Sequence, residues 1–138
     1  MEIQDEQIKD QGFKYDPHVL SIEFVKFYYT YLKSNPNLLI DSTGNFLFKD
    51  RSVYKIQGKD YVGQECILNT LINLKARGVN HEISNIDVLQ SGLRRINILV
   101  TGKMFLDGFT YNFTEYFHIG CVKKNSDWFI QSSILRTL

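Results

Sequence analysis

The strongest constraint on the fold is a two-residue alternation of apolar and polar side chains through most of the C-terminal half. The alternating segments are residues 83–89, 95–105, 111–122 and 128–135. A period of two places successive side chains on opposite faces of a β-strand. The breaks at residues 90–92, 107–108 and 123–127 are short and rich in turn-forming residues. They predict hairpins that join four long antiparallel strands into a meander.

Helix signals dominate the first part of the chain instead. Asp16-Pro17 combines an N-cap side chain with a proline at the first helical position, which predicts a helix from there to about Lys33. Asn35-Pro36 repeats the same signal and predicts a short second helix that carries the apolar residues 38–40.

A third helix is predicted further along, for residues 63–76, with Gly78 at its C-terminal end. Two short strands are predicted before it, at residues 46–48 and 52–56. The order of elements therefore predicts an α+β fold in which three N-terminal helices pack on the antiparallel meander.

Length and composition favour one globular domain. With 138 residues, of which 43% are hydrophobic, the chain is long enough to bury a core and too apolar to be disordered. We expect residues 1–15 to form a flexible polar leader and residues 16–138 to form the domain. The leader has no apolar signal segment, and no stretch reaches the length of a membrane span, which predicts a soluble, non-secreted protein.

Charge and motif content exclude several classes of function. A net charge of +1 gives no global attraction to nucleic acid or anionic lipid, so we expect neither as a partner of this domain. No metal-ligand spacing, phosphate-binding loop or dinucleotide motif occurs, so no metal or other cofactor is predicted. Cys66 and Cys121 stand far apart in apolar runs, where we expect two small core residues in a reducing compartment.

The central strands of the meander carry bulky side chains on both faces. One face is expected to cover the helices, and the other is too rich in rings and aliphatic groups to face water alone. The simplest second burial partner is another copy of the same sheet, so we expect a homodimer. The residues assigned to the dimer face are Ile98, Val100, Phe113, Glu115 and Phe117.

Six short motifs occur in order along nearly the whole chain. They are Phe24-Val25-x-x-Tyr28-Tyr29, Val62-Gly63-Gln64-x-x-Ile67, His81-x-Ile83-x-x-Ile86-Asp87, Val100-x-Gly102, Phe113-x-x-x-Phe117, and Trp128-x-Ile130 followed by Arg136. In this order they resemble the nuclear transport factor 2-like family. The resemblance implies a cone in which helices pack on a curved antiparallel sheet.

Within that family, residues 101–105 resemble the N-terminal domains of stress-granule scaffolds and deubiquitinase cofactors. The resemblance implies a dimeric module, cytoplasmic and also nuclear or at the nuclear envelope, that binds short Phe-containing motifs in an mRNP, stress-granule or deubiquitinase complex. The implied groove residues are Phe24, Phe27, Tyr28, Trp128 and Ile130. An ordinary core role for the Phe24 and Trp128 rings is the alternative.

Two positions near this groove depart from the family pattern. Ser42-Thr43 replaces an aromatic pair, and Ser132-Ser133 replaces an Asn-Asp pair. Both departures predict a change in the shape of the groove and in the partner that it accepts.

A second hypothesis from the resemblance is a nucleocytoplasmic transport factor that binds Phe-Gly nucleoporins and the GDP form of Ran. Ran binding in this family uses carboxylates around the mouth of the cone. Asp107 is the one carboxylate at a matching place, while Gln57 and Phe109 stand where the others would lie. Each missing charge-assisted contact costs about 1.5–3 kcal/mol, which weakens the Ran hypothesis.

The same fold also hosts isomerases and dehydratases that use the cone pocket. Candidate residues for such chemistry are Asp87, His81, His118 and Tyr28. General acid–base catalysis needs a base paired with an oxyanion donor, and no matched pair stands at a recognisable spacing here. We therefore expect a protein that is not an enzyme.

Overall fold

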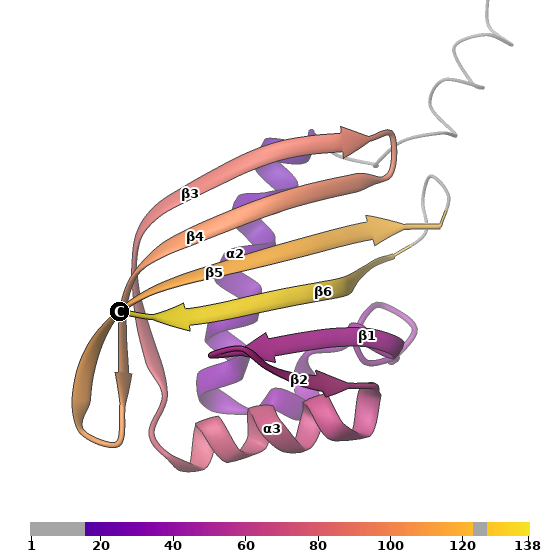
Figure 1. Cartoon of the computed structure of the whole chain (residues 1–138). Helices are drawn as coiled ribbons and strands as arrows, with labels where there is room; N and C mark the ends of the chain where they lie inside the picture. Colours follow the sequence, from indigo (N-terminus) through magenta and orange to yellow (C-terminus); the bar gives the residue numbers. More distant parts are fainter. Residues whose placement is uncertain (1–15, 123–126) are drawn as a thin grey trace, which may run out of the picture.

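Six β-strands form one continuous curved sheet around a long helix (Figure 1). The computed structural model describes residues 16–122 and 127–138, so the predicted leader and most of the predicted turn at 123–127 lie outside the described residues. The strands are β1 (Phe48–Ile56), β2 (Lys59–Val62), β3 (Asn80–Gly92), β4 (Arg95–Leu106), β5 (Phe109–Cys121) and β6 (Trp128–Thr137). Their order across the sheet is β2-β1-β6-β5-β4-β3, which makes β2 and β3 its edges.

The meander predicted from the alternation is confirmed. Strands β3 to β6 pair in sequence order and antiparallel, with Leu99 opposite Tyr116 and Tyr116 opposite Ile134. The turn between β4 and β5 has two central residues with positive φ, Asp107 at 55° and Gly108 at 80°. This backbone matches the right-handed twist of the strands that it joins, as two-residue hairpins require.

The other half of the sheet differs from the prediction. β1 runs parallel to β6, with Tyr54 opposite Ser133, so the sheet is mixed and the expectation of a purely antiparallel sheet is wrong. A single strand from Phe48 to Ile56 replaces the two short strands expected there, and it forms a hairpin with β2. β1 is remote in sequence from β6, so no local pattern sets the direction of their pairing.

Two of the three predicted helices are confirmed. α2 (Pro17–Ser34) begins after Asp16, whose carboxylate accepts hydrogen bonds from the backbone N–H groups of His18 and Val19 at 2.8 and 3.3 Å. These bonds satisfy donors that the first turn of a helix leaves free. α3 (Gln64–Ala76) ends before Gly78, which adopts the left-handed conformation at φ 76°.

The predicted short second helix is wrong. Residues 36–38 form a single 3₁₀ turn, η1 (Pro36–Leu38), which the Asn35 side chain caps. The chain then leaves the helical path because Leu39 is fully buried and Ile40 forms a β-bridge with Phe46. Within the described residues the fold has two α-helices, and α3 lies between β2 and β3, not in an N-terminal helical group.

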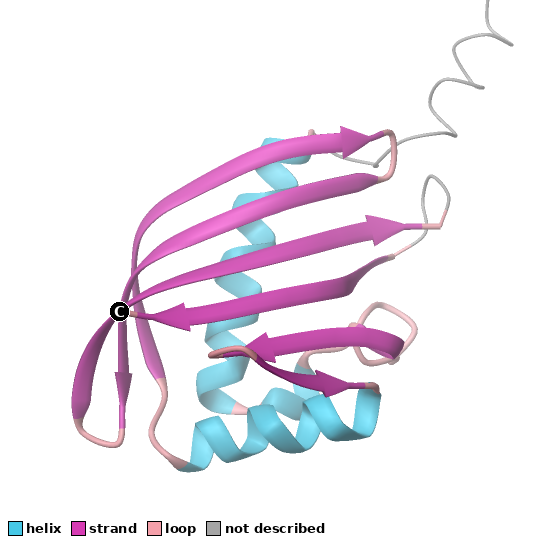
Figure 2. Cartoon of the chain, in the orientation of Figure 1, coloured by secondary structure: helices cyan, strands magenta, loops and turns pink. Residues whose placement is uncertain are grey.

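The helices cover one face of the sheet, which we call the inner face; the opposite face is the outer face. α2 crosses the inner face, and α3 lies against β1 and β2 at one end, the base in Figure 2. The core is built from both α-helices and from the inward residues of the strands, among them Phe48, Ile98 and Phe117. This arrangement closes the interior with apolar side chains.

The structure overturns the residues assigned to the dimer face. Ile98, Val100, Phe113, Glu115 and Phe117 are each at most 2% exposed, because they lie on the inner face within a single chain. The half-exposed or exposed residues of the outer face are their alternating neighbours, such as Leu99, Tyr116 and Ile134. Both faces carry bulky residues, so the sequence could not decide which face packs on the helices.

Candidate functional site

Three aromatic residues expected in the peptide groove meet near the middle of α2. The ring of Phe24 lies 4.8 Å from the Trp128 ring, and the Phe27 ring lies 5.9 Å from Trp128 at an interplanar angle of 90°. Phe24 and Phe27 are three residues apart and therefore share a side of the helix. Trp128 is the first residue of β6, which brings it from the far end of the sequence to this helix.

These rings differ in their access to solvent. Phe24 is buried, whereas Phe27 and Trp128 are half-buried and pack on the core from outside. Tyr31 joins them, with its ring 4.9 Å from that of Phe27. We call Phe27, Tyr31 and Trp128 the aromatic slot. Tyr31 was not among the groove residues expected from the sequence, although its position four residues after Phe27 on the helix places it on the same side.

Three of the five groove residues do not offer a contact surface. Phe24, Tyr28 and Ile130 are at most 1% exposed and belong to the core. A partner could reach them only by opening the packed interior. For these three, the expectation of a direct peptide contact is wrong, and Phe24 acts as the floor beneath the slot.

A tight turn lies beside the slot, at the position where the family pattern has an aromatic pair. The Asp41 carboxylate accepts hydrogen bonds from the backbone N–H groups of Thr43 and Asn45 at 2.9 and 3.0 Å. Ser42 donates its hydroxyl to the Asp127 carboxylate at 2.6 Å, next to Trp128. The small residues therefore fasten the turn to the start of β6 and add no ring to the slot.

A buried carboxylate is the main polar feature of the interior. Glu115 is fully buried and accepts hydrogen bonds from the hydroxyls of Tyr29 and Tyr54, both at 2.7 Å, and from Ser133 at 3.2 Å. Burial raises the pKa of Glu115 to about 7, although the three donors oppose the rise. Burial and the nearby carboxylate raise the pKa of both tyrosines, so they stay protonated and donate.

The carboxylate of this cluster is closed to solvent. Tyr54 and Glu115 have no exposed surface that a substrate could reach. His81 packs its ring 4.3 Å from that of Tyr29, and burial lowers its pKa to about 4, so it is neutral. Glu115 was assigned to the dimer face from the sequence, because alternation alone does not show which face of the sheet the helices cover.

The four residues considered for catalysis do not converge. Tyr28 and His81 lie on the inner side, in the core or against it. Asp87 is exposed opposite Leu99, and His118 contacts Asn97 at 2.7 Å, both on the outer face. The sheet therefore separates them into two groups, and they cannot act on one substrate.

The mouth of the cone contains a small apolar cavity. Its volume is about 230 Å³, and Leu74, Met104 and Leu135 contribute to its lining. At the rim, Arg77 donates two hydrogen bonds to the Asp107 carboxylate, at 2.6 and 2.9 Å. The carboxylate that the Ran hypothesis needs is thus already paired with a cation.

The other two rim positions of the Ran hypothesis carry no charge. Gln57 exchanges two hydrogen bonds with Thr137, at 2.7 and 2.9 Å, which holds the rim together. Phe109 is 66% exposed and presents a ring to solvent.

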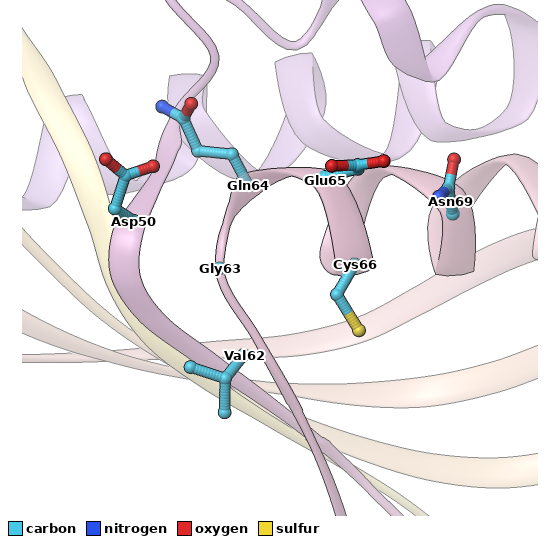
Figure 3. Close-up of a pocket in the computed structure, with 7 residues that line it drawn as sticks. All are labelled: Asp50, Val62, Gly63, Gln64, Glu65, Cys66 and Asn69. Atoms are coloured by element: carbon cyan, nitrogen blue, oxygen red, sulfur yellow. The ribbon is translucent and has the colours of Figure 1, made fainter.

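An open polar depression lies at the start of α3 (Figure 3). In Figure 3, Asp50 and Gln64 flank it on one side, and Cys66 extends from the first turn of the helix. Cys66 is exposed, so the expectation of two buried cysteines holds for Cys121 but is wrong for Cys66. Residues 16–122 and 127–138 contain no group of three or more His, Cys, Asp or Glu side chains placed to hold a metal ion.

No helix in the described part of the chain combines the length and hydropathy needed to cross a membrane.

The structure has a curved mixed sheet around one long helix, a closed interior and an aromatic slot at the surface. These features define a cone-shaped α+β fold, the class of protein that the sequence predicts. The model of the nuclear transport factor 2 (NTF2) domain matches residues 20–137. This chain therefore belongs to the NTF2 domain family.

Known relatives agree with this assignment. Nuclear transport factor 2 of Schizosaccharomyces pombe is 25% identical over 124 residues, which cover 88% of this chain and 95% of the relative. The structure of Ntf2 from Cryptosporidium parvum has a TM-score of 0.74 at 23% identity and covers 88% of this chain and 94% of its own.

The fold recurs in proteins with other roles. The complex of the yeast deubiquitinase Ubp3 with its cofactor Bre5 matches at a TM-score of 0.73 and 18% identity, covering 90% of this chain and 98% of that one. The hexachlorocyclohexane dehydrochlorinase LinA-type3 of Novosphingobium barchaimii matches at 0.68 and 12% identity, covering 87% and 86%. Such identities establish the shared fold, and function must be argued from the site.

Proposed function

We propose that this chain is a dimeric protein-interaction module that binds short Phe-containing peptides at the aromatic slot. The observation that carries the proposal is the packing of two half-exposed rings, Phe27 and Trp128, on the buried ring of Phe24. A partner's phenyl ring added to this cluster would gain about 0.5–1.5 kcal/mol of aromatic contact beyond the area that it buries. The rings are already held by the core, so little conformational entropy is lost on binding.

The biological setting that we propose is an mRNP or stress-granule assembly, or a deubiquitinase complex, in the cytoplasm or nucleus. The fold similarity to the Ubp3 and Bre5 complex supports the second option. No catalytic role is proposed, because the interior carboxylate is closed and the outer titratable groups are separated from it.

A dimer through the outer face is part of the proposal. Leu99, Tyr116 and Ile134 lie in one row across β4, β5 and β6. Asp87 stands beside Leu99 at one end of this row, and Lys55 stands beside Ile134 at the other. A two-fold axis along the strands would place Asp87 of one copy opposite Lys55 of its partner, so the row is complementary to itself.

Trp128 provides the test of the slot, because it is the sole tryptophan of the chain. We expect a Phe-Gly peptide to shift Trp128 fluorescence to shorter wavelength as the indole loses contact with water. Phe27→Ala should weaken the affinity about tenfold, which corresponds to about 1.4 kcal/mol and is typical of a truncated aromatic anchor.

The matched control is Phe109→Ala, which removes an exposed ring at the opposite end of β5 from the strand end that pairs with Trp128. This variant should bind the peptide as the wild type does. Equal effects of the two substitutions, or an unchanged emission at saturating peptide, would exclude the slot as the binding site.

The second candidate is a transport carrier that binds Phe-Gly nucleoporins and Ran in its GDP form. The similarity to nuclear transport factor 2 of S. pombe and the cavity at the mouth favour it. The Arg77–Asp107 pair and the uncharged Gln57 oppose it, because neither position offers Ran a free carboxylate. Calorimetric titration with GDP-loaded Ran should give no binding at tens of micromolar, and a micromolar Kd would establish the carrier instead.

A further inference from the structure

A second surface feature lies on the other side of α2, away from the slot. A groove of about 510 Å³ runs between α2, from His18 to Thr30, and the edge strand β3. Ile22 and Val25 contribute apolar groups from the helix, and Ile83 and Ile86 contribute them from the strand. Because successive helical residues are rotated by about 100°, the groove residues and the slot residues occupy opposite sides of α2.

The strand that borders this groove has an open edge. β3 is 13 residues long and pairs with β4 on one side only among the described residues. A shift in register between Ile83 and Asn85 marks a bulge at Ser84, which also lines the groove. A long edge strand with unpaired backbone groups is a template for strand addition unless another segment covers it.

We propose that residues 1–15 of this chain occupy the groove and cover the edge of β3. This segment lies outside the described residues and joins the domain at Asp16, two residues before His18, which lines the groove. The helix wall from His18 to Thr30 is roughly 18 Å long at 1.5 Å per residue. About six extended residues span that distance, so the leader is long enough to follow the groove.

The chemistry of the leader matches that of the groove. Ile3, Ile8 and Phe13 are apolar residues that can pack between the isoleucine walls. Residues 1–15 contain four Asp or Glu and two Lys, which gives a side-chain charge of 4 − 2 = 2 negative units. The residues that line the groove include Lys26 and no carboxylate, so the two surfaces are complementary in charge.

Hydrogen exchange of the full chain, followed by mass spectrometry, tests this proposal. In an Ile8→Ser/Phe13→Ser double variant, the amides of residues 83–86 should exchange at least about fivefold faster than in the wild type, because the cover leaves the edge. Gln4→Ser/Gln11→Ser changes two polar leader residues and is the matched control, with no expected effect. A synthetic peptide of residues 1–15 added to the Ile8→Ser/Phe13→Ser variant should restore the slow exchange.

Two results would overturn the proposal. One is an equal rate of exchange for residues 83–86 in the wild type and in the Ile8→Ser/Phe13→Ser variant, which would show that residues 1–15 do not occupy the groove. The other is protection that disappears on dilution, because that would assign the groove to a second copy of the chain. Lys26→Glu gives an independent check, since reversing this charge should speed exchange in the leader itself.

Discussion

At the scale of single residues, Glu115 is the least expected feature of the molecule. An ionised carboxylate without partners is very costly to bury. Here Tyr29, Tyr54 and Ser133 supply three hydroxyl donors, which reduce that cost without removing it. The pKa of Glu115 therefore stays above its usual value, at about 7.

This raised pKa predicts a pH-dependent stability. The folded-state pKa of Glu115 exceeds its ordinary value of 4.5, so its contribution is fully present below pH 4.5 and is lost as the pH rises through about 7. Compared with Glu115→Gln, the wild type should gain on the order of 3 kcal/mol in unfolding free energy between pH 8 and pH 4.5. Denaturant unfolding of both proteins across this range measures the difference.

The comparison of two proteins removes an opposing effect. Burial lowers the pKa of His81 to about 4, so its contribution is present above pH 6.5 and is lost as the pH falls toward 4. His81 is common to the wild type and to the Glu115→Gln variant, and its effect cancels in their difference. A difference that does not change with pH would show that Glu115 keeps an ordinary pKa.

At the scale of elements, the bulge in β3 depends on a glycine in the neighbouring strand. A Cβ at Gly102 would lie 2.1 Å from the backbone oxygen of Glu82, a distance that real structures do not allow. The two backbones approach closely at this point because Ser84 is inserted into the edge strand beside it. Gly102 is therefore required for the pairing of β3 with β4.

Gly102→Ala should destabilise the protein by about 1–3 kcal/mol, since a backbone must move to accept the methyl group. Chemical denaturation monitored by circular dichroism measures this change. Gly92→Ala is the matched control in the same pair of strands, because its added Cβ would meet no atom closer than 4.0 Å. If both substitutions had the same small effect, the close approach at Gly102 would not limit the fold.

At the scale of the whole molecule, the outer face of the sheet sets the expected assembly. Leu99 and Ile134 are each 41% exposed there, in line with the ring of Tyr116. Packing of this row against a second copy removes apolar surface from water, which stabilises the dimer by about 25 cal/mol for each Å² buried.

Leu99→Asp should convert the dimer to a monomer, because the interface would bury a new carboxylate next to its two-fold axis. Light scattering at tens of micromolar measures the mass, and circular dichroism checks that the fold remains. Val19→Glu adds a charge on an exposed position of α2 and should leave the dimer intact. A monomeric mass for the wild type would refute the dimer itself.

Much of the fold was predictable from local pattern. The alternation with a period of two identified four long strands, and the caps at Asp16 and Gly78 placed the ends of α2 and α3. Such signals depend on neighbouring residues alone, since they reflect backbone geometry and local hydrogen bonds. The same local logic failed at residues 36–40, where the burial of Leu39 and the bridge of Ile40 outweigh the helix signal.

The sequence by itself determined the two α-helices, the four strands of the meander, the hairpin turn at residues 107–108, and Phe27 and Trp128 of the slot. The tertiary structure alone decided which face of the sheet packs on α2, and with it the inward position of Glu115 and the outward position of Leu99. It also decided the parallel pairing of β1 with β6. The physical reason is that side-chain burial and strand direction depend on contacts between segments far apart in sequence, which alternation along one strand cannot encode.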